Sequence, residues 1–221
     1  TDRRTLKPYR KKVGDFVQYA DISPSGKRAV FEARGEVFSV PAKNGVIRNL
    51  TRSSGVAERY PAWSPDGKTL AYWSDRTGEY ELTLRPADGS GEERSLTKLG
   101  PGFRYGPTWS PDSKKIAFID ETFAIRLVDV ETEEVEQIDS ALRWSHGALS
   151  NFGVSWSADS RWMTYSRDLE NGNNAVFLYD TEEGVRSQVT AGFYSSSSPV
   201  FDPDGKYLYW VSPRNFEPSY S

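Results

Sequence analysis

Short apolar segments alternate with polar turns along the chain, and the apolar segments are too short to form ordinary helices. The most regular ones are rich in aromatic and β-branched side chains and lie at 28–31, 69–73, 115–119, 161–165 and 207–211. Segments of this length and composition are typical of buried strands. No segment keeps a 3.6-residue apolar period, so the pattern predicts an all-β protein.

A turn of four residues precedes each of these apolar runs. The turns read SPSG at 23–26, SPDG at 64–67, SPDS at 110–113, SADS at 157–160 and DPDG at 202–205. Successive copies start 41, 46, 47 and 45 residues apart. Proline presets φ at the second position, and Ser, Asp and Gly suit the other positions of a type I turn. The chain is therefore built from five copies of one structural unit.

Each unit has room for four strands. One strand enters the turn and the apolar run leaves it, and third strands are expected at 36–40, 80–84, 124–128 and 175–179. More polar fourth strands are expected at positions such as 46–50 and 94–97. Four short strands repeated at this interval are the signature of a propeller blade. We therefore predict a β-propeller made of four-stranded antiparallel blades, here an incomplete ring of about four to five blades.

One large apolar residue stands directly before each turn and is expected to pack between neighbouring blades. These residues are Ile22, Trp63, Trp109, Trp156 and Phe201. The cluster of tryptophan, turn and apolar run is thus interpreted as scaffold rather than as a ligand site.

The repeats also suggest a division of the chain. Residues 1–16 are expected to form an N-terminal connection, 17–211 the propeller, and 212–221 a truncated C-terminal segment. The blades are expected at 17–52, 58–98, 104–140 and 151–191, with a partial blade at 196–211. Since the chain starts with Thr1 and its one methionine is Met163, we expect it to be part of a longer protein. An open arc of blades would expose apolar faces, so self-association is also expected.

The amino-acid composition excludes or disfavours several classes of function for this chain. The 28 basic and 31 acidic residues give a net charge of −3, which disfavours a nucleic-acid partner. The absence of cysteine excludes disulfides, thiolate metal sites and a cysteine nucleophile. No apolar stretch approaches the roughly 18 residues that span a bilayer, so membrane insertion is not expected. The cellular compartment stays open.

The sequence contains few residues in the patterns that catalytic sites require. His146 is the only histidine and lies in a long insertion, LRWSHGALSNFG, at 142–153. Neither Ser145 nor Ser150 has the Gly-x-Ser-x-Gly context of a nucleophile, and no spacing of acidic residues matches a calcium loop. We therefore expect no catalytic, cofactor-binding or metal site in this chain.

The repeats resemble those of TolB, of prolyl-oligopeptidase-type peptidases and of tricorn protease. The stretch from 31 to 82 is most similar to the tricorn-like serine peptidases. The segments that carry this resemblance are EARGEVF at 32–38, RNLT at 48–51 and ERYPAWSPDGK at 58–68. In that family two propellers precede a PDZ domain and a catalytic core, and the propellers are not catalytic. The present chain lacks the PDZ and peptidase regions.

This resemblance implies the second propeller of a tricorn-like peptidase. Its expected role is a scaffold and a peptide access or exit channel for a serine peptidase core absent from this chain. Two alternatives stay open: a stand-alone TolB-like propeller that binds a protein partner, and the propeller of a prolyl-oligopeptidase-type enzyme. The expected partners are accordingly peptides or a protein.

If the chain contacts peptide, the inner strands that line a propeller channel are the place to look. The first candidates are Gln18, Tyr19, Glu58, Asn151 and Phe152. The strongest candidates are two Arg-Tyr pairs, Arg59–Tyr60 and Arg104–Tyr105, which are interpreted as matched positions of two blades. Arginine could hold a peptide carboxylate while tyrosine stacks; alternatively, both arginines bridge blades. The serines at 195–198 are expected to pack at an inner strand.

Overall fold

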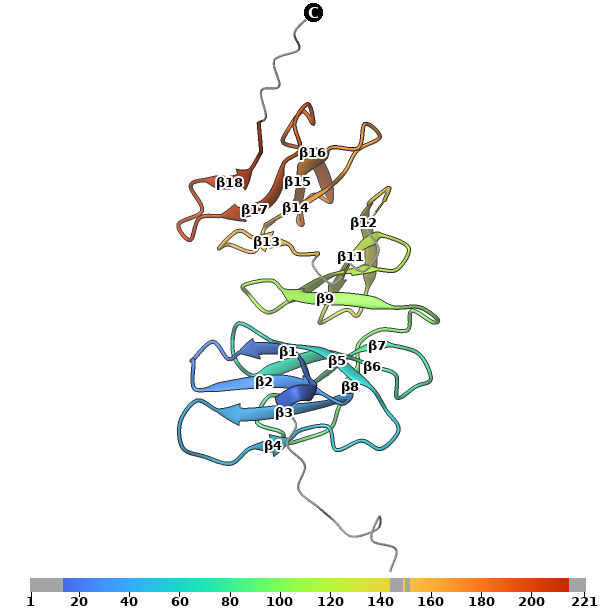
Figure 1. Cartoon of the computed structure of the whole chain (residues 1–221), viewed down its shortest axis with the longest axis vertical. Coiled ribbons are helices and arrows are strands. Elements are labelled where there is room, and N and C mark those ends of the chain that lie inside the picture. Colours follow the sequence, from blue (N-terminus) through green and yellow to red (C-terminus); the bar gives the residue numbers. More distant parts are fainter. Residues whose placement is uncertain (1–13, 144–148, 150–151, 215–221) are drawn as a thin grey trace, which may run out of the picture.

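The computed structural model describes residues 14–143, 149 and 152–214, and these residues form antiparallel sheets (Figure 1). A short 3-10 turn, η2 (Gly14–Phe16), leads into the first strand. Four sheets have four strands each and a fifth has two, and each sheet is called a blade below, numbered in chain order. The predicted all-β propeller of four-stranded antiparallel blades, in an incomplete ring, is confirmed.

The strands follow the chain order within every blade. Blade one holds β1 (Val17–Ile22), β2 (Arg28–Ala33), β3 (Glu36–Pro41) and β4 (Arg48–Asn49). Blade two holds β5 (Glu58–Trp63), β6 (Thr69–Ser74), β7 (Glu81–Pro86) and β8 (Arg94–Ser95). Blade three holds β9 (Arg104–Trp109), β10 (Lys115–Asp120), β11 (Ala124–Asp129) and β12 (Val135–Ser140). Blade four holds β13 (Ser155–Trp156), β14 (Trp162–Asp168), β15 (Asn174–Asp180) and β16 (Val185–Gln188), and blade five holds β17 (Ser197–Phe201) and β18 (Leu208–Val211).

The repeated turn holds its shape through its own side chains. In blade two, Ser64 Oγ donates to Asp66 Oδ1 at 2.5 Å, and Gly67 N donates to the Ser64 carbonyl at 2.8 Å. Asp66 Oδ1 also accepts from the backbone of Lys68, and Ser64 Oγ accepts from that of Thr69. The same bonds recur at Ser110 and Asp112 in blade three. Ser and Asp at these two positions therefore fix the hairpin that joins the first two strands.

Consecutive turns are also linked to one another. Asp66 N donates to Ser113 Oγ at 3.1 Å, and Asp112 N donates to Ser160 Oγ at 3.0 Å. Ser113 and Ser160 take left-handed φ angles of 62° and 65°, which glycine would adopt more readily. Serine at the last turn position thus has a strained backbone φ, but its side chain accepts a hydrogen bond from the preceding blade.

The apolar residue before the turn packs between blades where a preceding blade is described. Trp63 packs with Val30 and Val37 of blade one, and the Nε1 of Trp109 donates to the Ala62 carbonyl of blade two at 3.3 Å. The prediction is wrong for Ile22, which is 68% exposed. Blade one is the first of the described blades, so no described blade packs over this side chain.

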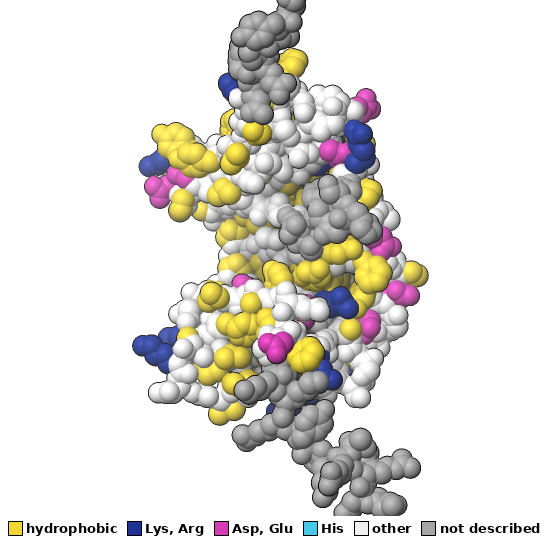
Figure 2. Space-filling view, in the orientation of Figure 1, with side chains coloured by type: hydrophobic (Ala, Val, Ile, Leu, Met, Phe, Trp, Pro, Cys, Tyr) yellow, Lys and Arg dark blue, Asp and Glu magenta, His cyan; other side chains and the backbone are white. Residues whose placement is uncertain are grey.

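The blades form an open arc. Figure 1 shows blades one and two at one end of the molecule, blade three in the middle, and blades four and five at the other end. Figure 2 shows that the surface is hollowed between the two ends. The middle strands β6 and β10 are buried along nearly their whole length, whereas most of β18 is exposed. The core therefore lies between blades rather than within one sheet.

Candidate functional site

The first strand of each blade forms the inner edge of the arc. Strand β1 contacts β5, β5 contacts β9, and β13 contacts β17 across the blade junctions. Each of these strands pairs within its own blade on one side only. The inner strands therefore bring side chains from successive blades to a common surface.

Three tyrosines form a row on this surface, one from each of the first three blades. The ring of Tyr60 lies edge-on to that of Tyr19, with 5.4 Å between centroids. On its other side Tyr60 lies edge-on to Tyr105, at 6.2 Å. All three are half-buried, and burial raises the pKa of Tyr19 and Tyr60. Tyr19 and Tyr60 are therefore uncharged at neutral pH, and the row offers aromatic surface to stack on and hydroxyl groups that can hydrogen-bond.

A pocket of about 210 Å³ opens beside this row at the junction of blades two and three. Its lining holds all four of the strongest sequence candidates together with three further aromatic residues. The lining residues are Arg59, Tyr60, Trp73, Tyr80, Phe103, Arg104 and Tyr105. The three aromatic residues that sequence reasoning missed come from β6 and from loops. Trp73 and Tyr80 belong to blade two, where Trp73 pairs with Arg59, and the packing of blade three against blade two brings Phe103 to them.

The two Arg-Tyr pairs are not at matched positions, which corrects the interpretation from the sequence. In the strand register Arg59 pairs with Trp73, whereas Arg104 pairs with Asp120 at the end of the strand. The pairs are offset because Tyr60 lies three residues before its tryptophan and Tyr105 lies four before its own. Arg104 therefore corresponds to Glu58.

The offset places Tyr60 at a bulge. The register of β5 against β6 shifts between Arg59 and Ala62, and Tyr60 has a left-handed φ of 54°. Gly106 takes the equivalent position in blade three, with a φ of 46°. An aromatic residue in this conformation is strained, and such strain is concentrated at functional sites.

The two arginines consequently differ in role. Arg104 is buried, and its guanidinium donates to the carbonyl oxygens of Tyr80 at 3.2 Å and Gly102 at 2.6 Å. This side chain bridges blades three and two, as the structural alternative expected. Arg59 is exposed, and its guanidinium lies 5.7 Å from the ring centroid of Tyr80. Arg59 thus presents a positive charge at the pocket.

Two lining residues of the pocket also have a buried hydrogen-bond donor that is not used within the described part of the chain. Trp73 Nε1 and Arg104 Nε are buried and have no partner among the described residues. Both groups can only donate. Both atoms are enclosed by protein, so the exposed guanidinium of Arg59 is the group that makes the pocket suited to an acceptor, such as a carboxylate oxygen.

The remaining sequence candidates fall in other places. Gln18 is exposed, whereas Glu58 is fully buried and accepts from Ser53 Oγ at 2.6 and 2.8 Å. Phe152 is buried in the core beside Tyr105. The expected serine packing holds at Ser196, which is 3% exposed. Asn151 and His146, with the serines beside His146, lie outside the described residues.

The described residues show neither a metal-ligand cluster nor a membrane-spanning helix. Within residues 14–143, 149 and 152–214, no group of three or more His, Asp or Glu side chains is placed to hold a metal ion. No helix in the same residues is long and apolar enough to cross a membrane.

Comparison with known proteins decides the family. Residues 17–221 match the family described as the tricorn protease second beta propeller domain. The chain belongs to this family. The tricorn protease homolog 1 of Streptomyces coelicolor is 27% identical over 99% of this chain, which covers 20% of that protein. The tricorn protease of Thermoplasma volcanium is 30% identical over 97% of this chain, covering 19% of that protein.

Solved structures support the same fold. The crystal structure of a tricorn protease superposes with a TM-score of 0.79 at 21% identity, over 95% of this chain and 20% of the other. A putative TolB from Agrobacterium tumefaciens superposes with a TM-score of 0.62 at 21% identity. The match covers 89% of this chain and 70% of the TolB chain. This tricorn-family propeller thus spans about a fifth of the length of the tricorn relatives.

Proposed function

We propose that this chain is a non-catalytic propeller segment that supports a serine peptidase core carried elsewhere in its parent protein. Its inner strands would contact peptides on their way to or from that core. The observation that carries this proposal is the pocket between blades two and three, which is lined by exposed Arg59 and by Tyr60 and Tyr105 of the tyrosine row. Membership of the tricorn propeller family supports the scaffold role.

The chemistry of the pocket favours extended peptides over a particular side-chain sequence. The exposed guanidinium of Arg59 can donate to main-chain carbonyl oxygens, which every peptide carries. Tyr60 and Tyr105 supply aromatic surface for apolar side chains. Arg59 adds a preference for a carboxylate, which a peptide offers at its C-terminus.

The experiment compares labelled peptides that differ only at the C-terminus. Fluorescence anisotropy of the 221-residue chain should show tighter binding of a peptide acid than of the matching amide. Arg59→Gln should remove this difference, whereas the control Arg94→Gln, on the outer strand β8, should keep it. Equal behaviour of the two variants, or no binding by the wild-type chain, would contradict the proposal.

We also propose that copies of the chain associate through their exposed apolar faces. Exposed apolar side chains lie on the blades at both ends of the arc. They include Ile22, Val46 and Ile47 of blade one, and Tyr207, Tyr209, Trp210 and Val211 of blade five. Figure 2 shows hydrophobic side chains at both ends of the hollowed surface. Contiguous apolar surface of this kind marks interaction sites.

A further inference from the structure

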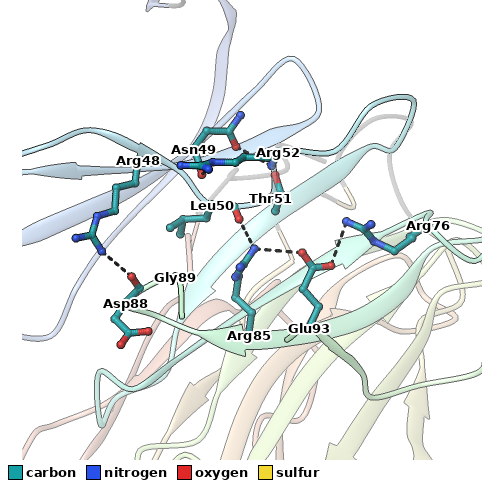
Figure 3. A pocket seen from close by; sticks show the side chains of 10 residues that line it. All are labelled: Arg48, Asn49, Leu50, Thr51, Arg52, Arg76, Arg85, Asp88, Gly89 and Glu93. Atoms are coloured by element: carbon teal, nitrogen blue, oxygen red, sulfur yellow. Dashed lines mark hydrogen bonds and ion pairs between the residues drawn. The ribbon is translucent and has the colours of Figure 1, made fainter. Parts of the chain in front are cut away.

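A second pocket, of about 500 Å³, lies at the outer side of the junction between blades one and two (Figure 3). Its lining comes from β4 and the residues that follow it, and from β7 and the loops around it. The lining residues are Arg48, Asn49, Leu50, Thr51, Arg52, Arg76, Arg85, Asp88, Gly89 and Glu93. This pocket shares no residue with the one on the inner strands.

The pocket has an excess of positive charge. Four arginines line it, against the two carboxylates of Asp88 and Glu93, and a third carboxylate, that of buried Glu58, lies 3.7 Å from Arg76 Nη2. Arg48 bonds the carbonyl oxygen of Asp88 at 2.7 Å rather than its carboxylate. The carboxylate of Asp88 accepts instead from Ser90 N and Oγ, at 2.8 and 2.6 Å, and Figure 3 shows it turned away from Arg48. Arg52 Nε likewise donates to a backbone oxygen, the Asn49 carbonyl, at 3.2 Å.

One carboxylate is shared by the two arginines at the centre of the pocket. Glu93 Oε1 lies 3.1 Å from Arg85 Nη1, and Glu93 Oε2 lies 3.2 Å from Arg76 Nη2. Figure 3 shows the carboxylate held between the two guanidinium groups. Two guanidiniums converging on one pair of oxygens is the arrangement that recognises carboxylate and phosphate groups.

Arg85 is the buried member of this set. Its side chain is 9% exposed, and its Nη1 also donates to the Leu50 carbonyl of blade one. Its Nε has no hydrogen-bond partner among the described residues. A buried cation with an unused donor favours additional negative charge nearby, because its own hydration has been removed.

We propose that this pocket binds a small, multiply charged oxyanion of the phosphate or polycarboxylate class. The oxyanion takes the place of the Glu93 carboxylate between Arg85 and Arg76, and Arg52 adds a third positive charge. The pocket volume falls within the range of small-molecule sites. Because the lining comes from two blades, the bound oxyanion also holds blade one against blade two.

The test is isothermal titration of the 221-residue chain with inorganic phosphate and, separately, with citrate, at constant ionic strength. The wild-type chain should bind at least one of them saturably at one site. Arg52→Gln and Arg76→Gln should each weaken binding by about tenfold, the effect of losing one charge-assisted hydrogen bond. Glu93→Gln should tighten binding, since it removes the competing carboxylate. The control Arg143→Gln, whose side chain is 64% exposed and pairs with Asp168 of blade four, should leave binding unchanged.

The opposite signs of the Arg76 and Glu93 variants keep the outcome distinct from misfolding, which would weaken binding in both. A preference for phosphate or for citrate identifies the source of the oxyanion. Heats that do not saturate, or that are equal in Arg76→Gln and Arg143→Gln, would overturn the proposal. The four arginines would then serve only to join the two blades.

Discussion

The backbone N–H of Tyr60 in blade two donates a hydrogen bond to Oε2 of Glu32 in blade one, at 3.0 Å. This bond satisfies the amide at the bulge, where Tyr60 takes its left-handed φ. It also holds the Tyr60 ring between the rings of Tyr19 and Tyr105. A buried carboxylate of one blade thus positions the central residue of the tyrosine row on the next.

The Glu32 carboxylate should make folding depend on pH. Burial raises its pKa, and the Tyr60 amide and Arg59 oppose the rise only in part. Between the ordinary value of 4.5 and the raised pKa, the folded chain therefore holds more protons than the unfolded chain. Its contribution to the free energy of unfolding should fall as the pH rises through this window.

Glu32→Gln keeps an acceptor for Tyr60 but cannot ionise, so it is the matched variant. Urea unfolding of both proteins between about pH 4 and about pH 7 measures the effect. The wild-type chain should lose stability relative to the variant as the pH rises. A difference that stays constant, or changes in the opposite direction, would show that the carboxylate is not destabilised by burial.

The hydrogen bond between consecutive turns should contribute measurably to stability. Ser113→Ala removes the acceptor of Asp66 N but keeps a side chain at a left-handed φ, and should cost about 1 kcal/mol in unfolding free energy. Ser113→Gly loses the same bond but relieves the backbone strain, so its loss should be smaller. Denaturant unfolding of the two variants gives the comparison. Equal losses would indicate that φ at this position carries no strain.

The apolar residues before the turns should differ sharply in importance. Trp109→Ala empties the junction between blades two and three and should cost about 3–5 kcal/mol. Ile22→Ala changes a side chain that is 68% exposed in a single copy, and at concentrations at which the chain is a single copy its effect should stay within about 0.5 kcal/mol. Thermal or denaturant unfolding measures both. A large loss for Ile22→Ala in the single copy would contradict the exposure of this side chain.

Self-association can be measured directly by light scattering. The wild-type chain should show a molar mass above the 24.9 kDa of one copy, increasing with concentration. Tyr209→Asp and Ile22→Asp each place a charge on an exposed apolar face and should shift the mass toward one copy. A wild-type mass of one copy at all concentrations contradicts association.

Most of the blade architecture could be predicted from the sequence because it is local. The turn residues and the apolar run that follows them determine a hairpin without reference to the rest of the chain. The inner-strand register could not be predicted in the same way. A bulge adds one residue to one strand, and whether Tyr60 or Arg59 occupies it depends on the pairing with β6 and on the bond to Glu32.

The two pockets show a second limit of sequence reasoning. The four inner-strand candidates were found because they precede the repeated turn. Trp73, Tyr80 and Phe103 were missed because strand pairing within blade two and the packing of blade three against it bring them to the pocket, and the turn pattern specifies neither. The arginine pocket is similar: Arg48 and Arg85 belong to different repeats, and no spacing in the chain relates them.

The most direct test of the account is to map where a peptide touches the propeller. A peptide acid carrying a benzophenone group is photo-cross-linked to the 221-residue chain, and the modified residues are identified by mass spectrometry. If peptides bind at the pocket between blades two and three, adducts should form there, at Tyr60, Tyr80, Phe103 or Tyr105. Excess unlabelled peptide should reduce their number. Adducts confined to the outer strands β4, β8, β12 and β16 would contradict binding at this pocket.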